Sequence, residues 1–149
     1  MVRYVDHYSR MFCSGDGLMD CKTANKVIRH ANFLIDKKKY AEAEVILDGA
    51  IEECCDYSTR GVGNLFGARG LVRKRQGRLE EALEDYNRSI ELHPYLNSSY
   101  VNRAVTLYKL KRYSECVADF MVGYQLGFAY NKSQLKLLSK ARELLQSSI

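Results

Sequence analysis

Hydrophobic residues recur three or four positions apart over most of the chain, which is the spacing of one face of an α-helix. In residues 131–147 this face consists of Leu135, Leu138, Ala141, Leu144 and Leu145, and charged residues take the other positions. In residues 3–13 the same spacing is found at Tyr4, Tyr8, Met11 and Phe12. The pattern predicts an all-helical protein with a helical segment near the N-terminus and an amphipathic helix near the C-terminus.

Turn-forming residues divide the intervening region into paired helices. We expect helices near 22–37, 40–54, 64–76, 79–92, 97–110 and 113–126. Residues 60–63 (Arg-Gly-Val-Gly) are predicted to open the second pair, and five extra residues near Ser58–Val62 predict a longer loop there. Gly77 suits the left-handed residue that ends a helix, Pro94 closes the second pair, and Gly127 closes the third. Three helical hairpins are therefore predicted.

Three small residues repeat with fixed spacing in each predicted hairpin. Within a set the gaps are 12 and 7 positions, and the middle members of successive sets lie 39 and 34 positions apart. The sets are Ala31, Ala43 and Ala50; Gly70, Ala82 and Ser89; and Ala104, Cys116 and Gly123. Small side chains let paired helices approach closely, and a period of this length is typical of a solenoid of helical hairpins.

These positions and the large residues around them resemble the tetratricopeptide repeat. The middle copy fits best, with Phe66, Gly70, Ala82, Tyr86 and Pro94 at the pattern positions. The resemblance implies an all-α, right-handed solenoid with repeats at 24–57, 63–96 and 97–130 in a single domain, residues 1–149. Residues 1–20 would form an N-terminal segment, and 131–149 a capping helix that covers the last apolar face.

The composition and charge of the chain exclude several classes of protein. Hydrophobic residues make up 46% of the 149 residues, which argues against disorder, and the formal net charge of +5 permits acidic partners. Residues 1–20 contain no apolar signal-peptide core, and no apolar run is long enough for a membrane span. Five cysteines without a C-x-x-C pair indicate reduced thiols. We therefore expect a cytoplasmic protein.

The sequence provides no clear set of residues for catalysis, a metal or a cofactor. His7, His30 and His93 fall in different segments, and no cysteine pair has the spacing of a zinc site. No glycine-rich phosphate loop and no nucleophile elbow is present. An enzyme would need a reactive thiol, which the spacing does not support. We expect a non-enzymatic protein without a cofactor.

In tetratricopeptide-repeat proteins the first helices of the hairpins line a concave groove. By this resemblance the groove would contain Ile28, Leu71, Val105 and Tyr108 for apolar contact, Asn32 and Asn102 for hydrogen bonds, and Lys74, Lys109, Lys132 and Lys136 for charge. Its partner would be an extended or helical protein segment with apolar and acidic residues. The alternative is that several of these apolar residues are ordinary core between hairpins.

Basic residues cluster at the same place in each repeat, where the first helix turns into the second. This basic ridge consists of Lys37, Lys38 and Lys39; Arg73, Lys74, Arg75 and Arg78; and Lys109, Lys111 and Arg112. Such a ridge predicts attraction to an acidic peptide, to RNA or to an anionic membrane. The alternative is structural, because cations near a helix C-terminus interact favourably with the helix dipole. RNA binding also favours aromatic platforms, and of the groove residues only Tyr108 is an obvious one.

Some members of this family bind the acidic C-terminal tails of cytosolic chaperones through a carboxylate clamp. One alignment of the clamp places Ile28, Asn32, Ala68, Ser98 and Asn102 at its positions, of which only Asn32 matches. The next alignment places Gly67, Leu71, Asn102, Lys132 and Lys136 there. Asn102 and Lys132 match, and Lys136 replaces an arginine without its bidentate geometry. The leading hypothesis is therefore a protein-binding adaptor, with a co-chaperone or a polyanion-binding protein as alternatives.

Overall fold

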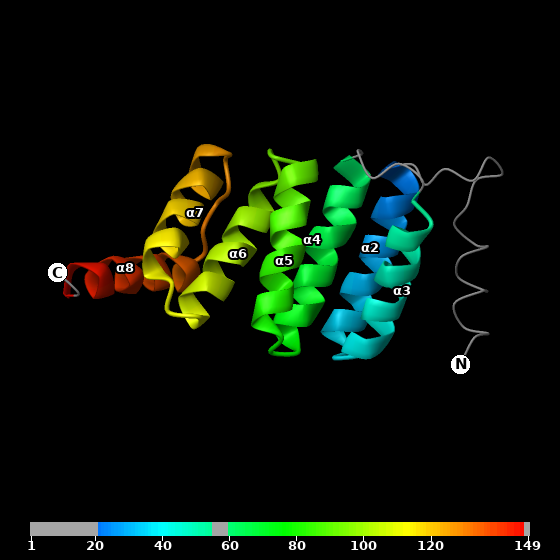
Figure 1. Ribbon diagram of the computed structural model, residues 1–149, viewed down its shortest axis with the longest axis horizontal. Coiled ribbons are helices and arrows are strands. Elements are labelled where there is room, and N and C mark those ends of the chain that lie inside the picture. Colours follow the sequence, from blue (N-terminus) through cyan, green and yellow to red (C-terminus); the bar gives the residue numbers. More distant parts are fainter. Residues whose placement is uncertain (1–20, 55–59, 148–149) are drawn as a thin grey trace. The chain divides into compact units, whose positions relative to one another are not determined.

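The computed structural model describes residues 21–54 and 60–147, and every regular element in these ranges is an α-helix (Figure 1). The helices are α2 (Cys21–Asp36), α3 (Tyr40–Glu52), α4 (Arg60–Arg75), α5 (Leu79–Leu92), α6 (Asn97–Lys109), α7 (Tyr113–Gln125) and α8 (Lys132–Ser147). The predicted helical segment at 3–13 lies outside the described residues. The other predicted helices are confirmed, and most of their ends fall within two residues of the predicted ones.

The chain divides into two compact units, and the boundary in the sequence falls between Pro94 and Tyr95. In the N-terminal unit, α2 pairs with α3 and α4 pairs with α5, and α4 also packs against both α2 and α3. In the C-terminal unit, α6 pairs with α7, and α8 packs mainly on α7 with fewer contacts to α6. The three predicted hairpins are present (Figure 1).

The repeating small residues lie where the paired helices approach each other most closely. All nine are buried, and each set is shared between the two helices of its hairpin. At Gly70 an added Cβ atom would come within 2.8 Å of the Tyr86 ring, so a larger residue would push that ring away. Tyr86 and Phe120, which fill the space beside the small residues, are themselves wholly buried. The spacing argument therefore identified the helix contacts correctly.

The corners of the hairpins share one hydrogen-bonded geometry. Lys38, Gly77 and Lys111 each have positive φ, between 59° and 82°. At the second corner the Gly77 amide donates to the Lys74 carbonyl and the Arg78 amide to the Arg73 carbonyl, at 3.2 and 2.9 Å. This pattern satisfies the last carbonyls of the helix. The left-handed conformation predicted for Gly77 is confirmed, and lysine adopts it at the two equivalent positions.

The start of α4 differs from the prediction. Residues 60–63, expected to form an opening turn, are the first turn of the helix. Gly61 and Gly63 are buried, and a Cβ atom at Gly63 would lie 2.9 Å from the Cβ of His93. Gly63 therefore allows the start of α4 to approach the end of α5 closely. The longer loop was predicted to extend to Val62, but α4 already begins at Arg60, so the loop ends before that residue. Residues 55–59 lie outside the described residues.

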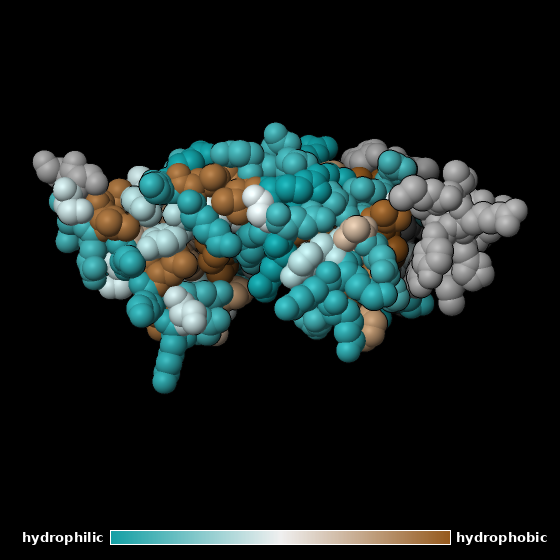
Figure 2. Space-filling view, turned by 90° about the horizontal axis from the view of Figure 1, so that it is seen from below, coloured by the Kyte–Doolittle hydropathy of each residue, from teal (hydrophilic) through white to brown (hydrophobic). Residues whose placement is uncertain are grey.

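The amphipathic helix α8 is less buried than its leucine pattern predicted. Asn131 and Gln134 cap its start reciprocally, each side chain accepting a hydrogen bond from the other's backbone amide, at 2.9 and 3.0 Å. Only Ala141 is fully buried, and Leu135 is 51% exposed. Hydrophobic residues of the C-terminal unit remain visible on the face shown in Figure 2. The helix covers α7 with part of its apolar face and leaves the rest at the surface.

Candidate functional site

In the N-terminal unit the predicted groove residues lie on the adjacent helices α2 and α4. Ile28 and Leu71 are half-buried and pack partly against the core shared by α2, α3 and α4. Asn32 is exposed, and Lys74 is half-buried near the end of α4. The two apolar side chains therefore serve the core and also keep some surface for contact with a partner.

In the C-terminal unit the remaining groove residues lie on α6 and α8, which contact each other. Asn102, Val105 and Tyr108 are half-buried, and Tyr108 packs against Tyr113 with ring centroids 5.5 Å apart. Lys109 at the end of α6 is exposed, as are Lys132 and Lys136 on α8. This unit thus presents amide, apolar and cationic groups without burying any of them completely.

The basic ridge residues lie at the hairpin corners, at the ends of α2, α4 and α6 and in the turns that follow. Several of their charges are paired with carboxylates. The pairs are Lys39 with Glu42, Arg73 with Glu44 and Asp85, Arg78 with Glu44 and Glu81, and Arg112 with Glu115. The ridge therefore carries less uncompensated positive charge than its sequence suggests.

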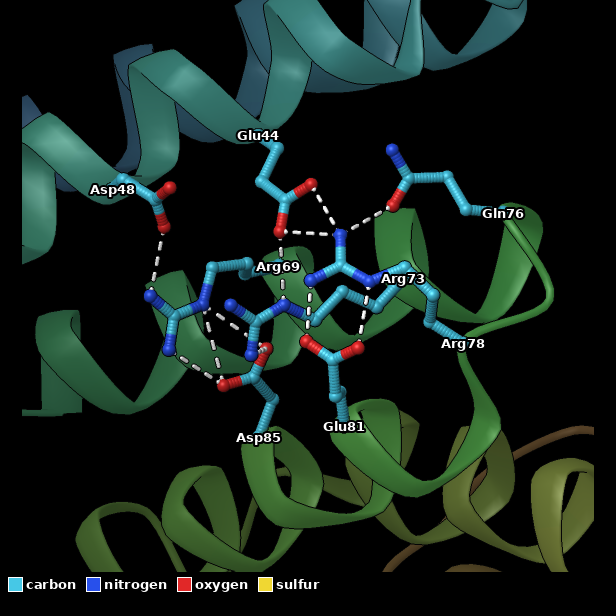
Figure 3. Close-up of polar contacts among 8 residues, drawn as sticks. All are labelled: Glu44, Asp48, Arg69, Arg73, Gln76, Arg78, Glu81 and Asp85. Carbon is cyan, nitrogen blue, oxygen red and sulfur yellow. Dashed lines mark hydrogen bonds and ion pairs between the residues drawn. The ribbon is translucent and has the colours of Figure 1, made fainter.

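Arginines of the second repeat join three helices of the N-terminal unit in one network (Figure 3). Arg69 on α4 binds Asp48 on α3 at 2.8 Å and Asp85 on α5 at 2.7 Å. Glu44 on α3 accepts hydrogen bonds from Arg73 at 3.0 Å and from Arg78 at 2.7 Å. The network ties the first hairpin to the second through side chains that are mostly shielded from water.

The two central carboxylates of this network respond differently to their surroundings. Burial raises the pKa of Asp85, and the hydrogen bonds and charges of Arg69 and Arg73 offset this only in part. Burial also raises the pKa of Glu44, but hydrogen bonds from Arg73 and Arg78 outweigh it, so the net pKa lies below the usual 4.5. Both groups serve structure, because each is enclosed by arginines of the same chain.

An arginine–aspartate pair recurs in the third repeat. Arg103 on α6 binds Asp119 on α7 at 2.7 Å, 34 positions after Arg69 and Asp85. Each arginine also lies over an aromatic ring, Arg69 over Phe66 at 5.2 Å and Arg103 over Tyr100 at 5.7 Å. Our sequence analysis missed these pairs. The signal was an arginine and an aspartate 16 positions apart in two successive repeats.

The family model of the tetratricopeptide repeat matches residues 64–95. This span coincides with α4, α5 and the turn after them, which carry the best-fitting copy of the repeat. The chain therefore contains a tetratricopeptide repeat at residues 64–95. The two other hairpins repeat the same buried small residues, so the all-α solenoid of tetratricopeptide-repeat (TPR) hairpins predicted from the sequence is confirmed.

Two curated proteins are similar to most of the chain. Sperm-associated antigen 1 of Homo sapiens and sperm-associated antigen 1A of Danio rerio are each 26% identical to the chain over 102 residues, 68% of its length. The chain spans only 11% and 23% of those two proteins. The similarity therefore concerns a small part of each of these longer proteins.

Solved structures show the same fold at low sequence identity. The first TPR domain of Spaghetti (RPAP3), bound to the HSP90 peptide SRMEEVD, has a TM-score of 0.72 and is 20% identical, covering 89% of this chain and 99% of that one. The second TPR domain of human RPAP3, in complex with the HSP70 peptide SGPTIEEVD, has a TM-score of 0.67 at 20% identity. It covers 83% of this chain and 98% of that one.

No grouping of three or more histidine, cysteine, aspartate or glutamate side chains suited to a metal exists in residues 21–54 and 60–147. Cys54 and Cys116 are buried free thiols, and burial raises the pKa of Cys116 to about 12. Within the same ranges, no helix has the length and apolar character of a membrane span.

Proposed function

We propose that this TPR protein is a non-enzymatic adaptor that binds an extended or helical segment of another protein. The binding surfaces are the partly exposed faces of the first helices, with Ile28, Asn32 and Leu71 in the N-terminal unit and Asn102, Val105 and Tyr108 in the C-terminal unit. Lys74, Lys109, Lys132 and Lys136 add positive charge, which favours acidic residues in the partner. We also propose that it acts in the cytoplasm, which fractionation with a compartment marker tests.

The arrangement of α6 is the observation that carries this proposal. One face of the helix is core, with Val101, Ala104 and Leu107 buried. The neighbouring face keeps Asn102 and Val105, three positions apart, only half-buried, and Tyr108 near the end of the helix is half-buried as well. A peptide that crosses Asn102 and Val105 and reaches Tyr108 gains hydrogen bonds from the amide and apolar contact from the two other side chains, because none of the three is fully buried.

A narrower candidate is the binding of acidic chaperone tails. Asn102, Lys132 and Lys136 match or approximate three clamp positions, and they lie on contacting helices of the C-terminal unit. Similar TPR structures hold peptides that end in EEVD. The two other positions hold Gly67 and Leu71, which offer neither a positive charge nor a side-chain amide. We therefore rank this candidate below a general peptide-binding adaptor.

A polyanion-binding protein is the other alternative. Ion pairs at Lys39, Arg73, Arg78 and Arg112 reduce the charge that the ridge offers to RNA or to an anionic membrane. If the ridge nevertheless binds a polyanion, the affinity must fall steeply with salt and show no peptide preference. This salt dependence separates the alternative from groove binding.

The test begins with a pull-down from native extract, followed by affinity measurements at two salt concentrations for the recovered partner. Labelled SRMEEVD and SGPTIEEVD peptides serve as defined probes. Groove binding predicts that Leu71→Glu and Tyr108→Ala remove most of the affinity, whereas charge reversal of Lys37, Lys38 and Lys39 mainly slows association at low salt. Glu84→Ala on α5 is the control. Wild-type affinity in correctly folded groove variants contradicts the proposal, and loss of affinity only in the ridge variant favours a polyanion.

A further inference from the structure

One side of α6 is covered by α7, the second helix of the same hairpin. A Cβ atom added at Gly123 of α7 would lie 2.8 Å from a methyl carbon of Val101 on α6. Tyr108, seven positions further along α6, packs against Tyr113 at the start of α7 with ring centroids 5.5 Å apart. Ala104 lies between Val101 and Tyr108 on the same side and is wholly buried. This side of a first helix is therefore the one that receives the second helix.

The equivalent side of α8 is open. The residues 34 positions after these three residues of α6 are Leu135, Leu138 and Arg142. Leu135 is 51% exposed, Leu138 is half-buried and Arg142 is exposed. The helix α8 packs mainly on α7, and no helix follows α8 within the described residues 21–54 and 60–147. The side on which α6 receives a helix therefore stays at the surface in α8.

Large apolar side chains continue along this open side. Leu145 follows Leu138 by seven positions on the same side of the helix and is also half-buried. The helix α7 contributes Met121, which is 41% exposed, and the Nη2 atom of Arg142 lies 3.3 Å from its Sδ atom. The end surface, as these residues are called below, consists of Met121, Leu135, Leu138, Arg142 and Leu145. It combines four large apolar side chains from two helices with one cation between them.

The charges of the three hairpins indicate which kind of helix suits the end surface. The first helices α2, α4 and α6 each carry more basic than acidic residues, and the second helices α3, α5 and α7 carry more acidic than basic residues. Ion pairs such as Arg103 with Asp119 join the two kinds of helix. The helix α8 is basic like a first helix, with three lysines and Arg142 against one glutamate. An acidic helix therefore complements α8, whereas the α8 of a second copy would bring like charges together.

We propose that the end surface docks an amphipathic helix of another protein, one that carries acidic residues beside its apolar side. The helix packs on α8 as α7 packs on α6, with its apolar residues against Leu135 and Leu138 and a carboxylate beside Arg142. This interaction goes beyond peptide binding in the groove, because the end surface shares no residue with the proposed groove. The two surfaces can therefore hold different segments of a partner.

Fluorescence anisotropy with two labelled synthetic helices tests this proposal on the full chain. The first probe has about 20 residues, because shorter helices are marginal in water, with leucine and alanine on one side and glutamate on both flanks. Its twin has glutamine in place of every glutamate. We expect the wild type to bind the glutamate probe about tenfold more tightly than the twin. Leu135→Glu and Arg142→Glu should each weaken binding of the glutamate probe by about tenfold.

Two control variants separate the end surface from its surroundings. Ser133→Glu places the same negative charge at an exposed position on the other side of α8. Leu71→Glu alters the proposed groove and leaves the end surface intact. Both variants should bind the glutamate probe within about twofold of the wild type. Circular dichroism of each variant confirms that the hairpins remain folded.

Four results would overturn the proposal. Wild-type affinity in the folded Leu135→Glu and Arg142→Glu variants means that the end surface does not hold the probe. Loss of affinity in Leu71→Glu alone means that the probe occupies the groove. A dimer that forms with rising protein concentration and is abolished by Leu135→Glu, measured by analytical ultracentrifugation, means that a second copy is the occupant. Binding of phosphatidylserine vesicles without binding of the glutamate probe means that the surface faces a membrane.

Discussion

Arg69 donates two parallel hydrogen bonds to Asp85, from Nη2 to Oδ1 at 2.7 Å and from Nε to Oδ2 at 3.0 Å. The Asp85 side chain is only 3% exposed, so the pair links α4 to α5 almost without contact with water. Arg73 approaches the same carboxylate at 3.1 Å. Two arginines thus share one buried negative charge.

Asp85→Asn should be strongly destabilising, because it removes the buried negative charge that Arg69 and Arg73 share and leaves each of them only its second carboxylate partner, Asp48 and Glu44 respectively. We expect the free energy of unfolding to fall by about 3 kcal/mol, measured by urea titration. The control is Glu91→Gln, which removes the exposed pair with Arg88 and should change stability by less than about 0.5 kcal/mol. Similar effects of the two variants would show that the network contributes little.

Ala82→Leu should test the repeat register. Ala82 is wholly buried in α5, where its hairpin has no room for a larger side chain. Overpacking is expected to lower the free energy of unfolding by about 1–3 kcal/mol. Exposed Glu84 on the same helix should tolerate Glu84→Ala within about 0.5 kcal/mol. Equal urea midpoints for the two variants would contradict the assigned contact.

The hairpin corners predict opposite effects of glycine at different positions. Gly77→Ala forces a side chain into the left-handed region and should cost about 1 kcal/mol. Lys111→Gly relieves the same strain at the equivalent corner and should stabilise by about 0.5 kcal/mol. Arg88→Gly, inside α5, should instead cost about 1 kcal/mol. Thermal melting of the three variants checks the signs, and a destabilised Lys111→Gly would refute the argument.

The hydroxyl of Tyr86 is expected to contribute nothing to stability. It is buried and has no hydrogen-bond partner among the described residues. Tyr86→Phe should therefore leave the free energy of unfolding unchanged or raise it by up to about 1 kcal/mol. Tyr130→Phe is the contrast, because the Tyr130 hydroxyl donates to the Phe120 carbonyl, and its loss should cost about 1 kcal/mol. A clear loss in Tyr86→Phe would mean that its hydroxyl has a partner.

Glu44 should make stability depend on acid pH. Its folded-state pKa lies below 4.5, so its stabilising contribution is present above the unfolded-state pKa and is lost as the pH falls through the folded-state pKa. The stability difference between the wild type and Glu44→Gln should therefore be large near neutral pH and shrink toward about pH 3. Glu84→Gln should show no such change. A constant difference across this range would rule out the assigned ion pairs.

The sequence by itself determined the helices, their pairing and the contact positions. Helix-forming stretches are separated by short turns, and small residues 12 and 7 positions apart can only serve as contacts if the two helices that carry them meet. Helix-forming stretches and repeat spacing are local or periodic properties of the sequence. They can therefore be recognised without knowing which helices pack against one another. The groove residues were expected from the resemblance to the tetratricopeptide repeat, and the sequence could not tell how much of Ile28 or Leu71 the core would cover.

Tertiary structure decided which charges are available and what the glycines do. The sequence suggests that Arg73 and Arg78 belong to a basic ridge. Glu44, some 30 positions earlier, forms ion pairs with both of them because α3 packs beside α4. The sequence suggests that Gly61 and Gly63 form a turn, but both lie in the first turn of α4, and the end of α5 is so close to Gly63 that a side chain there would collide with His93. Both outcomes depend on contacts between segments far apart in the chain, where side-chain direction and distance are set only after the helices have packed.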